Sequence, residues 1–172
     1  ILFLLFNTPL SFSQEKIDRP VYQLENENLQ TIPHSYFQYL EGVDHTIPFK
    51  ELKSGKWTNN MKTTQSFYDG YWVKIAVYNS TKNEVMGIHH NFNFEKKLIY
   101  ENKLGLKIFN FLDSEQKDYK YKDENRIWFD YKIRMPIGEV TEIYSYFRSQ
   151  PLDRVNSRKG GLDKISIGTW KE

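Results

Sequence analysis

The sequence predicts an all-β protein: a jelly-roll-like antiparallel β-sandwich of about eight strands, with at most one or two short helical turns. Two observations predict it. Apolar residues alternate with polar ones in many short segments, and turn-forming residues separate these segments throughout the chain. The 172 residues, 16% of them aromatic, suit one domain with an ample core.

The first residues are apolar up to Phe6 and end in small residues at Ser11 and Ser13. This pattern is typical of a secretory signal, so we expect residues 1–13 to be a signal remnant and residues 14–172 to form a single sandwich domain. The alternative is a buried N-terminal strand. Because the chain begins with Ile1 and lacks a basic n-region, we expect the start of the gene product to lie upstream.

Composition excludes several classes of function. The chain contains no cysteine, which excludes disulfides and thiolate metal sites, and an exported protein without disulfides is typical of a bacterial envelope. The formal net charge is only +2, and no region is basic enough to indicate a nucleic-acid partner.

The N-terminal part is predicted to contain little regular structure. A short strand is expected around Val21 to Leu24, and the segment from Ile32 to Leu40 supplies apolar bulk. One or two helical turns are expected over 46–52, because Thr46 can cap a helix and Pro48 suits its first turn.

The clearest strand lies within 70–84, where the side chains alternate with period two. We expect one face to hold Val73, Ile75 and Val77, and the other to hold Trp72, Lys74, Ala76 and Tyr78. This alternation predicts a half-buried strand. The polar residues from Asn79 to Thr81 should end it in a turn.

Further alternation and turns predict the remaining strands. These are expected over 88–94, 97–101, 104–112, 126–134, 140–148 and 165–170. Tight turns are expected at Asn102-Lys103 and from Pro136 to Glu139.

Four segments occur in an order that resembles a known family. They are YLEGVDHTIPFKEL (39–52), YWVKIAVYNSTKNE (71–84), MPIGEVTEIYSYFRS (135–149) and DKISIGTW (163–170). Together they resemble the second type of extracellular domain of bacterial seven-transmembrane receptors with diverse intracellular signalling modules (7TMR-DISM). The resemblance implies a carbohydrate-binding-module-like jelly roll that recognises an extracytoplasmic ligand, and it implies no catalytic residue.

Candidate ligand-binding residues follow from the aromatic excess, because sugars stack on exposed rings and bind polar side chains beside them. If the strands over 126–134 and 140–148 pair across the turn at Pro136, they form one polar-aromatic face. Its residues would be Trp128, Asp130, Lys132, Tyr144, Tyr146 and Arg148. The alternative is that the tyrosines and tryptophans of these strands cover the core.

Signatures of catalysis and metal binding are absent from the sequence. His89 and His90 are adjacent, and adjacent residues of a strand point to opposite faces, so one ion cannot easily bind both. The common hydrolase and phosphate-binding motifs are missing as well. We therefore expect no cofactor, no metal and no enzymatic activity.

The expected function is that of a ligand-sensing ectodomain of a bacterial membrane receptor, exported to the periplasm or the cell exterior and binding without turnover. Its expected partners are a carbohydrate or another small molecule, and the membrane region of the same receptor if the full-length protein continues past Glu172. One alternative is a free carbohydrate-binding or structural envelope module. Another is a small glycan hydrolase with Asp130 and Glu142 as acid and base.

Overall fold

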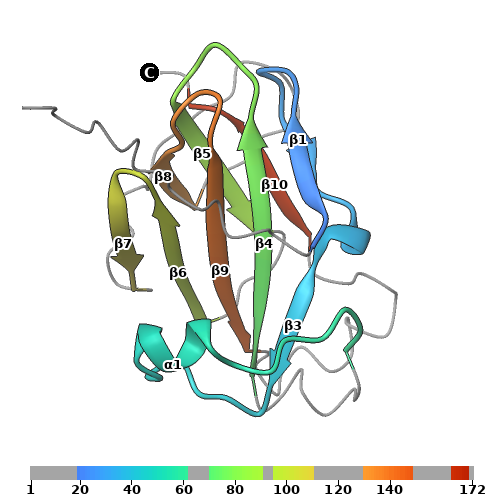
Figure 1. The fold of residues 1–172 in the computed structure, drawn as a ribbon, viewed down its shortest axis with the longest axis vertical. Coiled ribbons are helices and arrows are strands. Elements are labelled where there is room, and N and C mark those ends of the chain that lie inside the picture. The colour runs from blue at the N-terminus through green and yellow to red at the C-terminus, as the bar shows by residue number, and fades with distance from the viewer. Residues whose placement is uncertain (1–18, 62–69, 91–94, 111–129, 149–163, 171–172) are drawn as a thin grey trace, which may run out of the picture.

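Two β-sheets pack face to face in the computed structural model, which describes residues 19–61, 70–90, 95–110, 130–148 and 164–170 (Figure 1). The predicted all-β sandwich is confirmed. Helix is limited to one α-helix of five residues and one 3₁₀ turn of three within these ranges. None of the described helices has the length and apolar character that crossing a membrane requires.

The described part contains ten strands, two more than the approximate number predicted. Short strands from the N-terminal third, including β2 and β3, account for the difference. The elements are β1 (Val21–Leu24), β2 (Gln30–Thr31), η1 (His34–Tyr36), β3 (Gln38–Glu41), α1 (Phe49–Lys53), β4 (Tyr71–Asn79), β5 (Val85–His90), β6 (Glu95–Asn102), β7 (Gly105–Phe109), β8 (Tyr131–Arg134), β9 (Val140–Arg148) and β10 (Ile165–Thr169).

The larger sheet, which we call sheet A, has the strand order β1-β4-β9-β6-β7, and β3 also pairs with β4. One edge of β4 is shared: β3 runs antiparallel along Tyr71–Lys74, and β1 runs parallel along Ala76–Asn79. Sheet B has the order β2-β10-β5-β8. The predicted hairpin is confirmed as β6 and β7, with its turn at Lys103-Leu104, one residue later than predicted.

The core between the sheets is built from residues of alternating positions on both. From sheet A it includes Val73, Ile75, Val77, Leu98, Ile143 and Phe147, and from sheet B it includes Met86, Ile88, Ile133, Ile165 and Ile167. All of these side chains are at most 2% exposed. The predicted inner face of β4 is therefore confirmed.

The prediction of a half-buried β4 is wrong, because the outer face of sheet A is covered as well. Trp72 and Ala76 on that face are fully buried, and Lys74 is only 9% exposed. A second apolar cluster lies there, in which Leu40, Leu52, Trp72, Ile99, Tyr144 and Tyr146 pack together. The segment 43–57 with α1 supplies the cover, and a distant segment of this kind cannot be read from the alternation of one strand.

The helix lies where it was expected but begins later than Thr46. Its N-cap is Pro48, whose side chain cannot accept a hydrogen bond, and the first helical residue is Phe49. Thr46 instead donates its backbone N–H to Asp44 Oδ1 at 2.8 Å. Such Asx-type bonds favour a turn over a helix.

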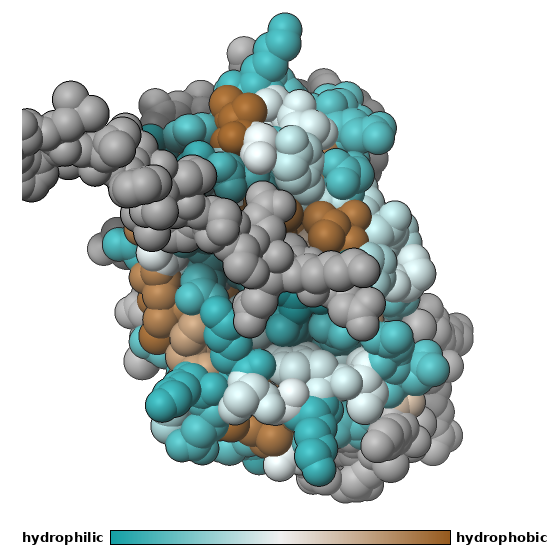
Figure 2. Space-filling view, in the orientation of Figure 1, coloured by the Kyte–Doolittle hydropathy of each residue, from teal (hydrophilic) through white to brown (hydrophobic). Residues whose placement is uncertain are grey.

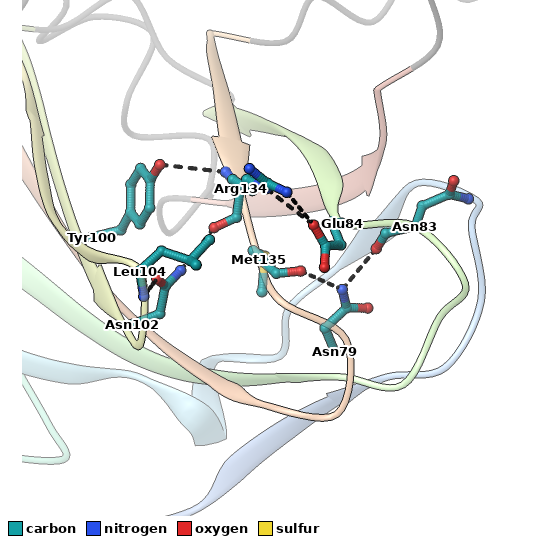
Figure 3. A network of polar contacts seen from close by, with 8 residues as sticks. All are labelled: Asn79, Asn83, Glu84, Tyr100, Asn102, Leu104, Arg134 and Met135. Atoms are coloured by element: carbon teal, nitrogen blue, oxygen red, sulfur yellow. Dashed lines mark hydrogen bonds and ion pairs between the residues drawn. The ribbon is translucent and has the colours of Figure 1, made fainter.

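Asn79 at the end of β4 joins two turns of the sandwich (Figure 3). Its side-chain amide donates to the carbonyl oxygens of Asn83 and Met135, both at 2.7 Å, and its Oδ1 accepts the backbone N–H and the hydroxyl of Thr81 at 3.1 and 2.8 Å. The residue is 0% exposed. The predicted end of the strand is thus fixed by a fully hydrogen-bonded side chain.

Gly70, directly before β4, has a φ of +90°, a conformation that side chains with a Cβ rarely adopt. A Cβ at this position would also overlap the hydroxyl of Tyr146. The glycine therefore allows the chain to enter β4 close against the outer face of β9.

Some predictions concern residues outside the described ranges. These are the secretory signal at 1–13, the second half of the strand expected over 88–94, and residues 126–129 of the strand expected over 126–134. Of the latter, only β8 from Tyr131 to Arg134 lies within the described part.

Candidate functional site

The predicted polar-aromatic face does not form, because its two strands lie in different sheets. β8 pairs with β5 in sheet B, whereas β9 pairs with β4 and β6 in sheet A. The Pro136 turn therefore carries the chain from one sheet to the other instead of closing a hairpin. The assumption that the strands over 126–134 and 140–148 pair with each other is therefore wrong.

The structure separates the predicted site residues. Lys132 lies on the outer face of sheet B, since its neighbours Tyr131 and Ile133 point into the core, and its ammonium lies 5.3 Å from the ring centroid of Trp170. Arg148 is exposed at the end of β9. Trp128 lies outside the described residues.

Asp130 belongs to a polar cluster at one end of the core. Its Oδ2 accepts the backbone N–H of His90 at 2.5 Å and lies 3.4 Å from Nδ1 of the same histidine. Nε2 of His90 lies 3.2 Å from the hydroxyl oxygen of Ser145. The order Asp130, His90, Ser145 is that of a nucleophilic triad, but His90 and Ser145 are 3% and 1% exposed and lie between the sheets. A substrate has no access there, so the cluster is best interpreted as a polar bridge between the sheets.

Tyr144 and Tyr146 share one face, as predicted, but both are buried on the outer face of sheet A and offer no open platform. A different group of residues lies around Tyr144 on the same face. We call this group the Lys74 cluster; it consists of Arg19, Trp57, Lys74, Glu142 and Tyr144.

Lys74 lies at the middle of the cluster. Its side chain is 11% exposed, so solvent reaches only a small part of it. The ammonium lies 5.3 Å from the ring centroid of Tyr144 and 5.5 Å from that of Trp57, in the geometry of a cation–π contact. Its nearest charged partner is Glu142 Oε2 at 4.0 Å, which is beyond hydrogen-bonding distance. Within the described ranges, no acceptor hydrogen-bonds to this ammonium.

The carboxylate of Glu142 already has two other partners. Arg19, which precedes β1, forms an ion pair with Oε1, and the hydroxyl of Tyr144 donates to Oε2. Ala76 is the β4 residue in register with Glu142 and presents only a methyl group to this face. That small side chain leaves room for the guanidinium of Arg19 to cross β4.

The segment with α1 forms one wall of the cluster. Leu52 of α1 is fully buried, and the indole N–H of Trp57 donates to its carbonyl oxygen at 3.1 Å. The rings of Phe49 and Trp57 both contact Tyr144 edge-on, at centroid distances of 5.3 and 5.7 Å. These contacts hold Trp57, which is itself half-buried, beside the lysine.

A second ion pair lies at the edge of the cluster. Lys53 at the end of α1 donates to Glu101 of β6 at 2.6 Å. Glu101 is in register with Glu142 across β6 and β9. Each of these two carboxylates is thus paired with a cation other than Lys74.

The pKa of Lys74 is lowered from 10.5 to about 8, mainly by burial and in smaller part by the positive charges of Arg19 and Lys53, with a partial offset by Glu101. Burial also lowers the pKa of Arg19 and raises that of Tyr144. The tyrosine therefore remains a hydrogen-bond donor, and the lysine is a cation whose charge the protein stabilises incompletely.

Figure 2 shows the face of the molecule on which these elements lie, with hydrophilic residues over most of it and hydrophobic residues in separate small patches. Chemically, the Lys74 cluster combines a cation that lacks an acceptor, a carboxylate and two aromatic rings. This combination suits recognition of a small polar ligand with an apolar face.

Comparisons with models of known protein families, with curated proteins and with solved structures found no match. In the part of the chain that the structure describes, no group of three or more histidine, aspartate or glutamate side chains could hold a metal ion. The fold is a β-sandwich, and its candidate site is defined by the contacts of this chain.

Sequence reasoning missed Lys74 and Arg19 as site residues. One signal for Lys74 was present, because this lysine lies within the most apolar strand, two residues after Trp72. No signal was present for Arg19, since its partner Glu142 is 123 residues away.

Proposed function

We propose that this chain is an extracytoplasmic ligand-binding domain of a bacterial membrane receptor, and that it binds a carbohydrate or another small molecule at the Lys74 cluster without turnover. The sequence resemblance to 7TMR-DISM ectodomains and the apolar leader support the receptor and its location. The β-sandwich and the chemistry of its outer face support a binding role.

The observation that carries the proposal is Lys74, whose side chain is only 11% exposed and whose ammonium has no hydrogen-bond acceptor among the described residues. A charged group in this state destabilises the fold, and an apolar residue of similar size would remove the penalty. Strongly perturbed ionisable groups gather at functional sites more often than elsewhere. A ligand that supplies an acceptor would satisfy the lysine and would gain binding free energy from it.

Two arguments favour binding over hydrolysis. Asp130 lies at the end of the core beside His90, whereas Glu142 lies on the outer face of sheet A, so the two carboxylates do not face a common substrate. Glu142 is also already engaged by Arg19 and Tyr144. A glycosidase needs two carboxyl groups on either side of one bond.

A thermal-shift screen against neutral and acidic monosaccharides and simple organic acids tests the proposal. A ligand at about a hundredfold its dissociation constant should add about 2.7 kcal/mol to the free energy of unfolding. The shift should be lost in Lys74→Met and kept in Lys50→Met, which removes an exposed lysine of α1. An equal shift in Lys74→Met would place the ligand elsewhere.

The receptor part of the proposal has a separate test. Reading the gene beyond Glu172 should show seven apolar segments, and a stop codon there would favour a free envelope module. For a receptor, the ligand must also bind one arrangement of the adjoining helices more tightly than the other, because equal affinities shift nothing.

A further inference from the structure

We infer that the ligand of the Lys74 cluster carries a single carboxylate beside an apolar ring face, as a uronic acid does. This inference rests on the proposed function, because it names the class of ligand for the same site.

The pairing of charges on this face carries the first step. Glu142 is paired with Arg19, and Glu101 is paired with Lys53, so both carboxylates have a cation of their own. Lys74 is the third cation, and it contacts Glu142 only at 4.0 Å. Among these five groups, three positive charges face two negative ones, so one further negative charge balances them. Lys97 of β6 lies on the same face and donates to the backbone carbonyl of His45 at 2.7 Å.

The hydrogen-bond donors give the second step. An ammonium has three N–H donors and no acceptor capacity. Lys74 is only 9% exposed, so solvent reaches only a small part of the residue. A carboxylate oxygen accepts charge-assisted hydrogen bonds, which are about twice as strong as neutral ones. A neutral hydroxyl would satisfy one donor but would leave the charge uncompensated.

The surrounding rings supply the third step. Trp57 and Tyr144 both lie beside the ammonium, and Trp57 is only half-buried. Aromatic faces pack well against the C–H face of a pyranose or against another flat apolar ring. A carboxylate attached directly to such a ring can reach Lys74 while the ring covers the indole.

The electrostatics agree with this geometry. The pKa of Lys74 is about 8, and the charges of Arg19 and Lys53 contribute to that decrease. A bound carboxylate would favour the charged lysine and raise this pKa. Binding near pH 8 should therefore be accompanied by proton uptake, and affinity should fall about tenfold for each pH unit above the pKa.

Isothermal titration calorimetry tests the inference. It compares the affinities of galacturonate and glucuronate with those of galactose and glucose at matched ionic strength. We expect the acids to bind at least tenfold more tightly than the neutral sugars in the wild type. This preference should disappear in Lys74→Met and persist in Lys74→Arg and in the control Lys50→Met. If Lys74→Met does not fold, as judged by its thermal melt, Lys74→Gln takes its place.

Proton uptake gives a second readout. Titrations near pH 8 in two buffers of different ionisation enthalpy should show uptake of up to about half a proton per site for the wild type. Lys74→Arg should bind the acid without uptake, because arginine stays charged. Uptake that persists in Lys74→Arg would overturn the role of this lysine.

The remaining outcomes separate the two proposals. Equal binding of acidic and neutral sugars would overturn the carboxylate inference and leave the proposed function standing. Binding of a simple organic acid alone, dependent on Lys74, would support the carboxylate and exclude the sugar. A preference for acids that survives in Lys74→Met would overturn the inference. The absence of binding by any compound would overturn the inference and would also contradict the proposed site.

Discussion

On the inner face of β4, Val73, Ile75 and Val77 lie in the core between the sheets, whereas on its outer face Trp72 and Lys74 lie beneath a separate cover formed by α1 and its neighbours. Both faces are buried, but only the outer one includes a charge. The inner face packs apolar side chains into the core and contributes to stability. The outer face includes a lysine in a covered position, and this difference is the reason for proposing the ligand site there.

Ile75→Ala tests the inner face and should have the largest effect. The side chain is 1% exposed within the core, so its truncation should cost about 2–5 kcal/mol of unfolding free energy through lost burial and a cavity. Urea denaturation measures the change, and ligand affinity at the Lys74 cluster should stay the same in the folded fraction. A loss below about 1 kcal/mol would contradict the tight packing of β4 between the sheets.

Asn79→Ala tests the end of β4, where the side chain of Asn79 joins two turns. The substitution leaves the carbonyl group of Met135 and the N–H of Thr81 without their partner, whereas the carbonyl of Asn83 keeps the hydroxyl of Thr81 at 3.1 Å. Buried unsatisfied groups cost about 1–3 kcal/mol each, and relaxation and water reduce the sum, so we expect a loss of about 3 kcal/mol.

Asn83→Ala is the matched control for this variant. It keeps the backbone carbonyl that Asn79 contacts, as Figure 3 shows, and removes only a side chain that points away from the network. The control should change the unfolding free energy by less than about 0.5 kcal/mol. Similar losses in both variants would mean that the turn, and not the buried amide, provides the stability.

The inner face was predictable because it depends on local alternation. Val73, Ile75 and Val77 recur with period two, and the same pattern identified β9 with its bounds, Val140–Arg148. The hairpin of β6 and β7 was predictable for the same reason, since a turn and its two strands are neighbours in sequence.

The outer face was not predictable, because its contacts join distant segments. The cover over Trp72 comes from residues 43–57, and the partner of Glu142 is Arg19. Sequence reasoning placed β8 beside β9 because they are consecutive, but the turn between them changes sheets. Alternation indicates which residues share a face, and it does not indicate what covers that face.

Lys74 should give stability a pH dependence that the inner face lacks. Its pKa is about 8 in the folded protein and 10.5 in the ordinary unfolded state, so the unfolded chain binds more protons between these values. Stability should therefore rise by roughly 2 kcal/mol from about pH 8 to about pH 10, and the full penalty should persist below pH 8. Chemical denaturation across this range measures the rise.

Lys74→Met provides the comparison, because all other titrating groups remain. The variant should lack this rise, and its stability relative to the wild type should be greatest near neutral pH. Above about pH 10 the raised pKa of Tyr144 should act in the opposite direction, since the unfolded tyrosine loses its proton first. Parallel profiles for the two proteins would contradict the burial of a charged Lys74.

The ion pair between Lys53 and Glu101 should have the smallest effect, although it links the cover of the outer face to sheet A. The two side chains are 47% and 33% exposed, so solvent and salt screen their interaction. A double-mutant cycle with Lys53→Met and Glu101→Gln should give a coupling of about 0.2–1 kcal/mol, decreasing as salt is added. Leu52→Ala in the same helix should cost more, because Leu52 is fully buried against the outer face. A coupling energy equal to or above the Leu52→Ala loss would mean that charge holds the cover in place. A coupling energy below that loss would show that apolar packing positions Trp57 beside Lys74, and that the ion pair only neutralises charge at the edge of the cluster.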